Sequence, residues 1–374
     1  MREFVIFACL SILSFAASAD EIEDRILKGQ IGQMLVVGFR GTAIDENAYI
    51  SKAIKDLNLG GVILFDIDVP TKRFPRNIVN PAQVKKLTAD LKACSSTPML
   101  IAIDAEGGLV NRLKPEYGFL DIPSHQKLGA KQDTKDTRNS SLALARELSE
   151  LGFNTNFAPV VDVNVNPLNP VIGKLGRSFS RNPLAVAAHA GAFIEGQHES
   201  GILTAVKHFP GHGSSSGDTH QGLVDITASY DDTELVPYEQ LIRNGLVDMV
   251  MTSHIMNLNY DATYPVTLSE HYIQPILREK FGFDGVVVSD DMNMGAITNH
   301  YRFEESLIRA VNAGCDLLII SNNGSSYDEN APYDAAGILF NAVRDNKIAI
   351  GRIHEAAQRI EKLKTRLTAE EANR

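Results

Sequence analysis

Continuous apolar runs recur along the chain and alternate with segments whose apolar residues are spaced as on one face of a helix. Most runs contain no polar residue at alternate positions, which is typical of strands buried on both faces of a parallel sheet. We therefore expect eight strands, at Gln33–Gly38, Gly61–Phe65, Met99–Ile103, Thr155–Val161, Thr204–Lys207, Met249–Ser253, Val286–Ser289 and Asp316–Ser321.

The segments between these runs are predicted helices. Leucines over residues 144–151 follow an i, i+4, i+7 spacing, and Gly152 is a predicted C-terminal cap. Asn80 is predicted to cap a helix that begins at Pro81. Eight strands separated by helices predict an α/β fold, a single (β/α)8 TIM barrel. An open doubly wound sheet is the alternative, but no G-x-G-x-x-G follows the first strand.

The first nineteen residues differ from the rest of the chain. Arg2 precedes an apolar stretch over 4–15, and small residues at 17–19 suit a cleavage site. We predict a signal peptide over 1–19 and a periplasmic or secreted protein, or a cytoplasmic one if the signal does not function. Residues 20–374 are predicted to form one barrel domain, and no second apolar segment approaches the length of a membrane span.

Composition narrows the range of partners. The chain is 44% hydrophobic and 22% charged, as is usual for globular proteins, and its net charge is −10. The negative charge argues against nucleic acid or an anionic membrane as a partner. We expect a monomer. Cys9 would leave with the signal peptide, and Cys94 and Cys315 are predicted to be buried thiols.

The segment 204–220, TAVKHFPGHGSSSGDTH, concentrates ionisable residues where a strand must end. Lys207 and His208 close the apolar run, and the proline and glycines that follow forbid a helix. Asp218 and His220 lie at the far end of a polar loop, so a carboxylate is within reach of an imidazole. A lone histidine is usually structural, but this grouping favours a functional site.

Other ionisable residues follow the predicted strands at the same end. Asp104 comes after the third strand, Asp162 after the fourth, His254 after the sixth and Asp290 after the seventh. Because TIM barrels carry their chemistry at the carboxyl ends of the strands, we expect these residues to share one rim.

Three roles are open for Asp290: nucleophile, metal ligand or helix cap, and the neighbouring Asp291 could serve as the cap. His208 and His212 have a spacing that binds zinc on a helix. Pro210 breaks any helix between them, so metal binding is disfavoured. Covalent catalysis by a carboxylate remains, as in retaining acetal hydrolysis.

Covalent catalysis of this kind also requires one group that can both donate and accept a proton. His220 suits this role because imidazole titrates near neutral pH, and Asp218 would orient the ring. Retaining enzymes usually employ two carboxylates, so a histidine dyad would be a departure. Polar groups suited to a polyhydroxylated ligand are Asp104, Arg177, Lys207 and His208.

Four segments carry a resemblance to a known family. KHFPGHG at 207–213 followed by DTH at 218–220 resembles the signature of β-N-acetylglucosaminidases of glycoside hydrolase family 3. IDAEGG at 103–108, GRSF at 176–179 and VSDDMNM at 288–294 resemble further motifs of that family, in the same order. The resemblance extends over residues 30–365. It is to the family members that consist of a single barrel domain.

The resemblance implies a retaining exo-hydrolase that removes terminal β-linked N-acetylglucosamine, commonly from muropeptides during cell-wall turnover, with no cofactor or metal. It implies that Asp290 is the nucleophile, that His220 is the acid and base, and that Asp218 is its partner. The residues implied to hold the sugar are Asp104, Arg112, Arg177, Lys207 and His208.

Two departures from the family pattern are expected to matter. Leu109 stands where the family often has arginine, and the predicted signal peptide suggests that the substrate is a peptidoglycan or chitin-type fragment outside the cytoplasm. A phosphorylase of the same architecture, a β-glucosidase and a catalytically silent sugar-binding protein are the alternatives. Retention of Asp218, His220 and Asp290 together weighs against the silent protein.

Overall fold

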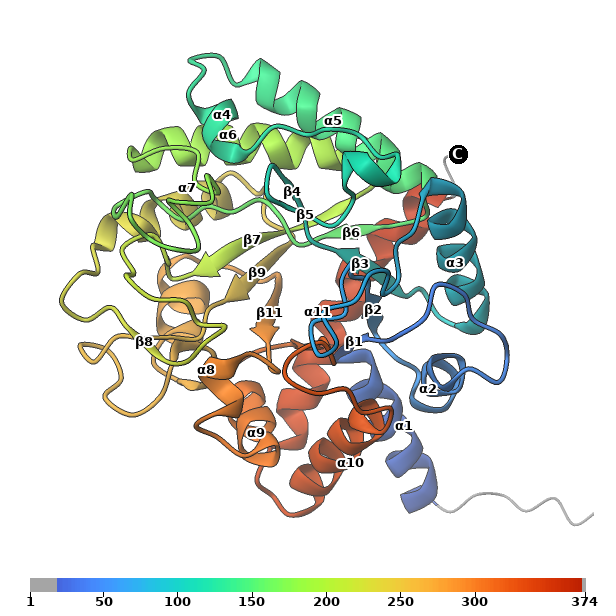
Figure 1. The fold of residues 1–374 in the computed structure, drawn as a ribbon. Helices are drawn as coiled ribbons and strands as arrows, with labels where there is room; N and C mark the ends of the chain where they lie inside the picture. The colour runs from blue at the N-terminus through green and yellow to red at the C-terminus, as the bar shows by residue number, and fades with distance from the viewer. Residues whose placement is uncertain (1–18, 372–374) are drawn as a thin grey trace, which may run out of the picture.

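The structure is a computed structural model and describes residues 19–371. Eight parallel strands close into a barrel in the order β1-β2-β3-β6-β7-β9-β11-β12, and β12 pairs with β1 (Figure 1). Each predicted apolar run overlaps one of these strands, although β7 and β11 extend beyond the predicted bounds, so the predicted TIM barrel is confirmed. The strands are β1 Leu35–Gly38, β2 Gly61–Ile63, β3 Leu100–Ile103, β6 Thr155–Asn156, β7 Leu203–Phe209, β9 Met249–Thr252, β11 Val286–Asp291 and β12 Leu317–Ile320.

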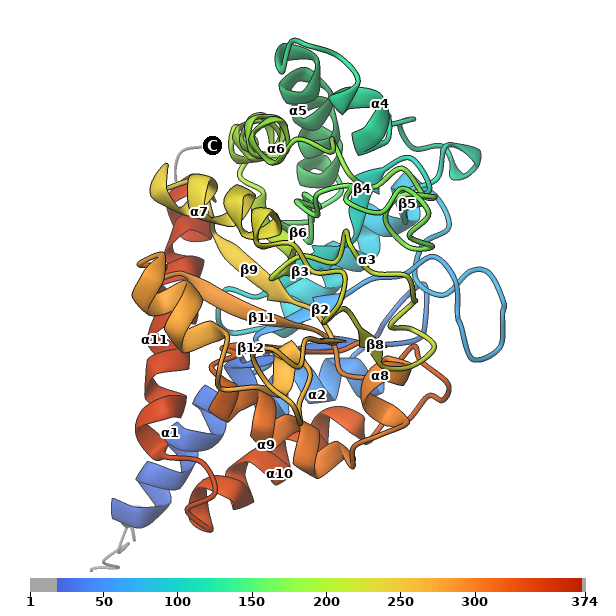
Figure 2. The same cartoon turned by 90° about the vertical axis from the view of Figure 1, so that its left-hand side faces the viewer.

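Helices surround the barrel and cover the outer face of the sheet (Figures 1 and 2). The helices α1 and α11, from the two ends of the described chain, pack against each other. The α-helices are α1 Ala19–Gln33, α2 Tyr49–Leu57, α3 Pro81–Cys94, α4 His125–Gly129, α5 Lys135–Glu150, α6 Pro183–His198, α7 Val236–Arg243, α8 Gly295–Thr298, α9 Phe303–Ala313, α10 Ala331–Arg344 and α11 Ile350–Glu371. A π-helix, η4 Ile273–Lys280, precedes β11, and the 3₁₀ helices are η1 Pro115–Tyr117, η2 Asp232–Leu235 and η3 Val266–Leu268.

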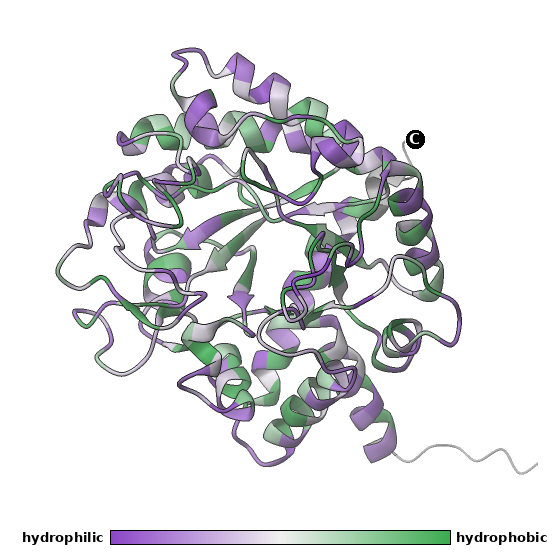
Figure 3. Cartoon of the chain, in the orientation of Figure 1, coloured by the Kyte–Doolittle hydropathy of each residue, from purple (hydrophilic) through white to green (hydrophobic). Residues whose placement is uncertain are grey.

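The core lies inside the barrel and between the barrel and its helices. Every residue of β1, β3, β9 and β12 is buried, which explains why their sequences are apolar without alternation. Hydrophobic residues accordingly follow the central strands, whereas the helices are polar on their outer faces (Figure 3).

The predicted helix ends are confirmed. The Asn80 side chain accepts a hydrogen bond from the backbone N–H of Gln83 at 3.0 Å, and Pro81 is the first residue of α3. After α5, Gly152 has φ +85°, and a Cβ at this position would lie 2.4 Å from Thr88 Oγ1. Only glycine fits this left-handed and crowded position.

The fourth strand is shorter than predicted. The predicted range Thr155–Val161 contains only the two residues of β6 and one isolated bridge from Val160 to Lys207. Pro159 interrupts the ladder because it has no N–H to donate. The carboxyl end of the strand therefore leads directly into an irregular segment at the barrel mouth.

Three small elements shape that mouth. A hairpin of β4 (Ala105–Gly107) and β5 (Val110–Asn111) follows β3. The segments after β7 and β9 pair as β8 (Val224–Asp225) and β10 (Ile255–Met256). The polar segment 67–80 lies in the loop that connects β2 to α3.

Two predictions about the rest of the chain can be compared with the structure. Cys315 is buried as predicted, but Cys94 is only partly buried because it is the last residue of α3; both are free thiols. The predicted signal peptide falls almost wholly on residues 1–18, outside the described part. Within residues 19–371, no helix combines the length and apolar character that a membrane crossing needs.

Candidate active site

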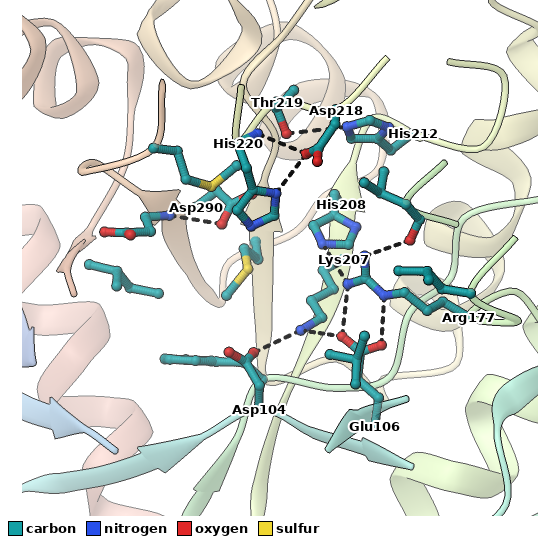
Figure 4. A pocket seen from close by; sticks show the side chains of 18 of the residues that line it. Asp104, Glu106, Arg177, Lys207, His208, His212, Asp218, Thr219, His220 and Asp290 are labelled. Atoms are coloured by element: carbon teal, nitrogen blue, oxygen red, sulfur yellow. Dashed lines mark hydrogen bonds and ion pairs between the residues drawn. The ribbon is translucent and has the colours of Figure 1, made fainter. Parts of the chain in front are cut away.

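A pocket of about 360 Å³ opens at the carboxyl ends of the strands. This volume is near the lower end of the range for small-ligand sites, about 300–1,000 Å³, and suits a single sugar unit. Side chains from several strand ends converge in it (Figure 4). It is lined by all eight site residues predicted from the sequence: Asp104, Arg112, Arg177, Lys207, His208, Asp218, His220 and Asp290.

Irregular strand ends aim the key side chains. Neighbouring side chains on a regular strand point to opposite faces, yet Lys207 and His208 both line the pocket. The pairing of β7 with β9 shifts register after Val206. The pairing of β11 with β12 shifts after Val288, just before Asp290. Such irregularities re-aim side chains beside active sites.

A buried ionic cluster forms one wall of the pocket. Lys207 Nζ lies 2.9 Å from Asp104 Oδ1 and 2.8 Å from Glu106 Oε1. The Arg177 guanidinium donates two hydrogen bonds of 2.8 Å to the Glu106 carboxylate. Burial alone would lower the pKa of Lys207, but the two carboxylates outweigh it and raise this pKa. The cluster is therefore fully charged at neutral pH.

Arg112 stands at the edge of this cluster with its side chain 34% exposed. Its guanidinium lies 3.5 Å from Asp104 and 3.8 Å from Asp66, and over the ring of Phe65 at 5.3 Å. These contacts are longer than those of Lys207, so Arg112 can turn toward a ligand. Leu109, 66% exposed, lines the pocket nearby.

His208 is fixed by a carboxylate beneath the pocket. Its Nδ1 lies 2.7 Å from Asp162 Oδ2, and its Nε2 lies 3.3 Å from Arg177 Nη2. The other oxygen of Asp162 accepts the backbone N–H groups of His208 at 3.1 Å and His212 at 2.8 Å. Burial would raise the pKa of Asp162, but these partners lower it, so it stays ionised.

Asp218 and His220 form a dyad on the loop after β7. Asp218 Oδ1 lies 2.8 Å from His220 Nδ1 and accepts the backbone N–H of His220 at 2.9 Å. This hydrogen bond raises the pKa of His220 and holds the pKa of Asp218 at about 2. Because Nδ1 is held by Asp218, Nε2 is the ring nitrogen available to exchange a proton with a ligand.

The dyad is anchored on both sides. The carbonyl oxygen of Thr219 accepts the N–H of Ala296 at 3.0 Å, which ties the loop to α8 beyond β11. A Cβ on Gly295 would lie 2.5 Å from the carbonyl oxygen of His220, so glycine permits the close approach. On the other side, Thr219 Oγ1 lies 3.5 Å from His212 Nε2.

Asp290 lies next to the dyad in the pocket. Figure 4 shows the His220 ring beside the Asp290 carboxylate. Burial would raise the pKa of Asp290, but three nearby imidazoles outweigh it, and the net pKa is lowered. Asp290 is therefore an anion. The imidazoles belong to His254, His208 and His220.

The adjacent carboxylate has a structural role. Asp291 accepts hydrogen bonds from the backbone N–H groups of Asn293 at 3.1 Å and Ser321 at 3.0 Å. It holds the turn after β11 and joins it to β12. It is not the helix cap that the sequence suggested, because the N-cap of α8 is Met294, which makes no side-chain cap hydrogen bond. Burial raises its pKa to about 6. Neighbouring aspartates thus differ in environment.

Three residues in or beneath the site had no role predicted from the sequence. Glu106 lies two positions after Asp104, a spacing that could have placed both on one side of the segment. Asp162 and His254 were predicted to lie on the rim, but the residues that they contact were not predicted. His254 lies buried beneath the pocket, with Nδ1 2.9 Å from Thr267 Oγ1 and Nε2 3.0 Å from the carbonyl oxygen of Asp291.

The histidines considered as metal ligands have other partners. His208 contacts Asp162, and His212 Nδ1 lies 2.7 Å from Ser215 Oγ. Across residues 19–371, no group of three or more His, Cys, Asp or Glu side chains is arranged to hold a metal ion.

Residues 26–363 match the family model of the glycosyl hydrolase family 3 N-terminal domain. The chain is 33% identical over 349 residues to Beta-hexosaminidase A of Pseudoalteromonas piscicida, a match that covers 87% of this chain and 56% of that protein. It is 35% identical over 304 residues to a Beta-hexosaminidase of Nitrosomonas eutropha, covering 79% of this chain and 82% of the relative.

Solved structures of the same fold are also similar. A glycoside hydrolase family 3 beta-N-acetylglucosaminidase from Paenibacillus superposes with a TM-score of 0.83 and 35% identity, over 92% of this chain and 63% of that one. Beta-N-acetylhexosaminidase from Beutenbergia cavernae gives a TM-score of 0.77 and 29% identity, over 91% and 98% of the chains. The chain thus spans a little over half of some relatives and nearly all of others.

Proposed function

Because the chain belongs to glycoside hydrolase family 3 and groups with its β-hexosaminidases, we propose that it is a retaining, exo-acting β-N-acetylglucosaminidase. Its substrates would be peptidoglycan or chitin-type fragments with a terminal β-linked N-acetylglucosamine. One observation carries the proposal: Asp290 and the Asp218–His220 dyad, from different segments of the chain, line the same sugar-sized pocket.

In the first step, an oxygen of Asp290 attacks C1 of the terminal sugar and the bond from C1 to the leaving oxygen breaks. His220 gives its Nε2 proton to that oxygen. The lowered pKa of Asp290 supports the anionic nucleophile, and the raised pKa of His220 supports the protonated acid. The products are a covalent glycosyl–Asp290 ester and the released aglycone.

In the second step, the neutral His220 takes a proton from water, and the water oxygen attacks C1. The ester bond to Asp290 breaks, so the carboxylate is regenerated and His220 is again protonated. Two displacements at C1 retain the β configuration. The group that acts as acid and then as base is an imidazole, so it is neutral, not anionic, when water attacks the glycosyl–enzyme. A neutral base would not repel a phosphate anion, so attack by phosphate is also compatible with this site.

The ionic cluster would bind the hydroxyl groups of the sugar. Asp104 offers carboxylate acceptors, whereas Lys207, Arg177 and Arg112 offer donors, and His208 lies between the cluster and Asp290 in the pocket (Figure 4). Because the cluster is already paired, its side chains are held in place before substrate arrives. Preorganised groups lose little free energy on binding.

The test is an assay of purified protein on aryl β-glycosides and chitobiose, with and without phosphate. We expect release of N-acetylglucosamine in the β configuration, with β-glucosides far poorer substrates. A predominance of N-acetylglucosamine 1-phosphate at physiological phosphate would assign a phosphorylase, and preferred cleavage of β-glucosides a glucosidase. Incubation with a fluorinated substrate that slows the second step should leave a sugar mass on the peptide containing Asp290.

We also propose that the reaction occurs outside the cytoplasm, on the strength of the apolar stretch over residues 4–15. Fractionation of cells that express the full chain tests this. We expect the protein in the periplasm or medium with Asp20 as its first residue, and a cytoplasmic protein that begins at Met1 would refute it.

A further inference from the structure

A buried carboxyl group outside the pocket contacts the loop that carries the dyad. Glu234, in the 3₁₀ helix η2, is fully buried and has no ion-pair partner among residues 19–371. Its Oε2 accepts the backbone N–H of Gly213 at 2.7 Å. Burying a carboxyl group without a cation costs free energy unless the group is neutral or fully hydrogen-bonded. The position of Glu234 therefore calls for a physical explanation.

The loop packs so closely on Glu234 that side chains are excluded. A Cβ on Gly211, which has φ +138°, would lie 2.5 Å from Glu234 Cβ. A Cβ on Gly213 would lie 3.0 Å from Glu234 Oε2 and 1.7 Å from the carbonyl oxygen of Val163. The two glycines of the PGHG segment thus allow the loop to rest directly on this carboxyl group.

A continuous set of contacts leads from Gly213 to the dyad. The adjacent His212 places its ring between Ser215, at 2.7 Å, and Thr219, at 3.5 Å. Thr219 lies between Asp218 and His220 in the chain. A displacement at Gly213 would therefore move the ring of His212 and, through Thr219, the proton donor.

The surroundings favour the neutral form of Glu234. Burial and the ionised Asp162 raise its pKa to about 8. The other ionisable groups that face it, Tyr230 and Tyr238, are neutral because burial raises their pKa well above the ordinary value. The Ser214 hydroxyl and the backbone N–H groups of Gly213 and Ser214 act in the opposite direction and lower this pKa, but burial outweighs them.

We propose that Glu234 is a positioning residue that, as a neutral carboxylic acid, holds residues 211–214 so that the Asp218–His220 dyad is presented correctly to the pocket. The inference rests on the proposed function, because it assumes that His220 transfers the proton. Glu234 contacts no pocket group directly and acts through Gly213 and His212.

The test compares Glu234→Gln with Glu234→Leu on substrates with good and poor leaving groups. Gln retains the acceptor for Gly213 and a donor toward Ser214, whereas Leu retains neither. For Glu234→Leu we expect kcat/KM to fall roughly 100-fold on chitobiose, but less than about fivefold on an aryl glycoside whose leaving group needs no proton. Glu234→Gln should stay within about threefold of the parent on both.

The ratio of the two losses separates positioning from stability, since a smaller folded fraction lowers both rates equally. Glu239→Gln, on an exposed carboxylate of the following helix, is the matched control and should change neither. Equal losses on the two substrates in Glu234→Leu, or a loss in Glu234→Gln as large as in Glu234→Leu, would overturn the proposal.

Thermal unfolding supplies a readout that needs no activity, even if Glu234→Leu does not fold. The folded-state pKa of Glu234 lies above its ordinary value of 4.5, so the parent loses stability as pH rises from about 4.5 to about 8. Glu234→Gln lacks this titration, and its Tm should rise relative to the parent across that window. If the difference in Tm between Glu234→Gln and the parent does not change with pH across this window, Glu234 is not a neutral acid in the folded protein. A parent without glycosidase activity refutes the proposed function, while this measurement still reports on Glu234.

Discussion

Two buried ionic clusters lie at opposite ends of the barrel. At the mouth, Lys207 sits between Asp104 and Glu106 and faces the pocket. At the other end, Asp316 immediately precedes β12 and is fully buried. Three arginines from the surrounding helices contact its carboxylate, at 2.8, 2.6 and 3.3 Å: Arg278 of η4, and Arg352 and Arg359 of α11.

The difference lies in what each cluster leaves exposed to a ligand. Asp316 also accepts the backbone N–H of Val287 at 2.9 Å, so its hydrogen bonds join β11, β12 and two helices. The mouth cluster instead has partners on one side and a pocket on the other. In TIM barrels the amino-terminal face serves stability and the carboxyl-terminal face serves chemistry. Substitutions at the two ends should therefore separate activity from stability.

The largest expected effect is at the mouth. Asp290→Ala removes the proposed nucleophile, and we expect kcat/KM to fall by roughly 10⁴-fold or more. Stability should change far less than activity, because Asp290 lies on the wall of the pocket and is not part of the hydrophobic core. Steady-state kinetics and urea unfolding of the same preparation measure both. Full activity in this variant would show that the nucleophile is another group.

His220→Ala should have the next largest effect, and it should depend on the substrate. We expect a loss of roughly 10²- to 10⁴-fold where the leaving group needs a proton, and a far smaller loss on aryl glycosides with acidic phenols. A Brønsted plot of kcat/KM against leaving-group pKa measures this and should become steeper. A slope equal to that of the parent would exclude His220 as the acid.

The cluster at the other end predicts the opposite outcome. Asp316→Asn leaves three partly buried arginines without their shared buried anion, and we expect the free energy of unfolding to fall by about 3 kcal/mol. The kcat/KM of the folded fraction should be unchanged. Asp284→Asn, at an exposed ion pair with Lys362, is the control and should stay within about 0.5 kcal/mol. A loss of kcat/KM in the folded fraction of Asp316→Asn would contradict the assignment of this cluster to stability alone.

The smallest expected effect is on pH dependence. The first step requires an ionised Asp290, whose pKa is lowered, and a protonated His220, whose pKa is raised by the hydrogen bond to Asp218. Activity should thus fall on the alkaline side as His220 loses its proton. Asp218→Asn weakens that hydrogen bond and should move the alkaline limb of kcat/KM to lower pH. An unmoved limb would mean that another group titrates there.

The barrel was predictable because its eight strands are buried on both faces, which leaves continuous apolar runs in the sequence. The helix caps at Asn80 and Gly152 were predictable for equally local reasons. The length of β6 was not, because the competition between an apolar pattern and Pro159 is decided by the neighbouring strands. The burial of Cys94 was overestimated because it depends on how the end of α3 meets the surface.

In the candidate site, too, local features were predictable from the sequence and tertiary contacts were not. Its eight residues were found from strand ends and motifs, but their partners were not. Asp162 and His208 are far apart in the sequence, and only the barrel brings them together. Glu234 gave no signal at all, since a carboxylate at the start of a helix is ordinarily explained by the helix dipole. Its burial under the PGHG loop is a tertiary feature.

Closure of the barrel through β1 and β12 has a consequence for how the chain acquires its structure. The hydrogen-bonding edge of β1 meets its last partner only when residues 317–320 are present. A ribosome or an export channel that delivers the chain from its N-terminus must therefore release nearly all of it before the ring can close. Until then, an open edge prone to wrong pairing persists.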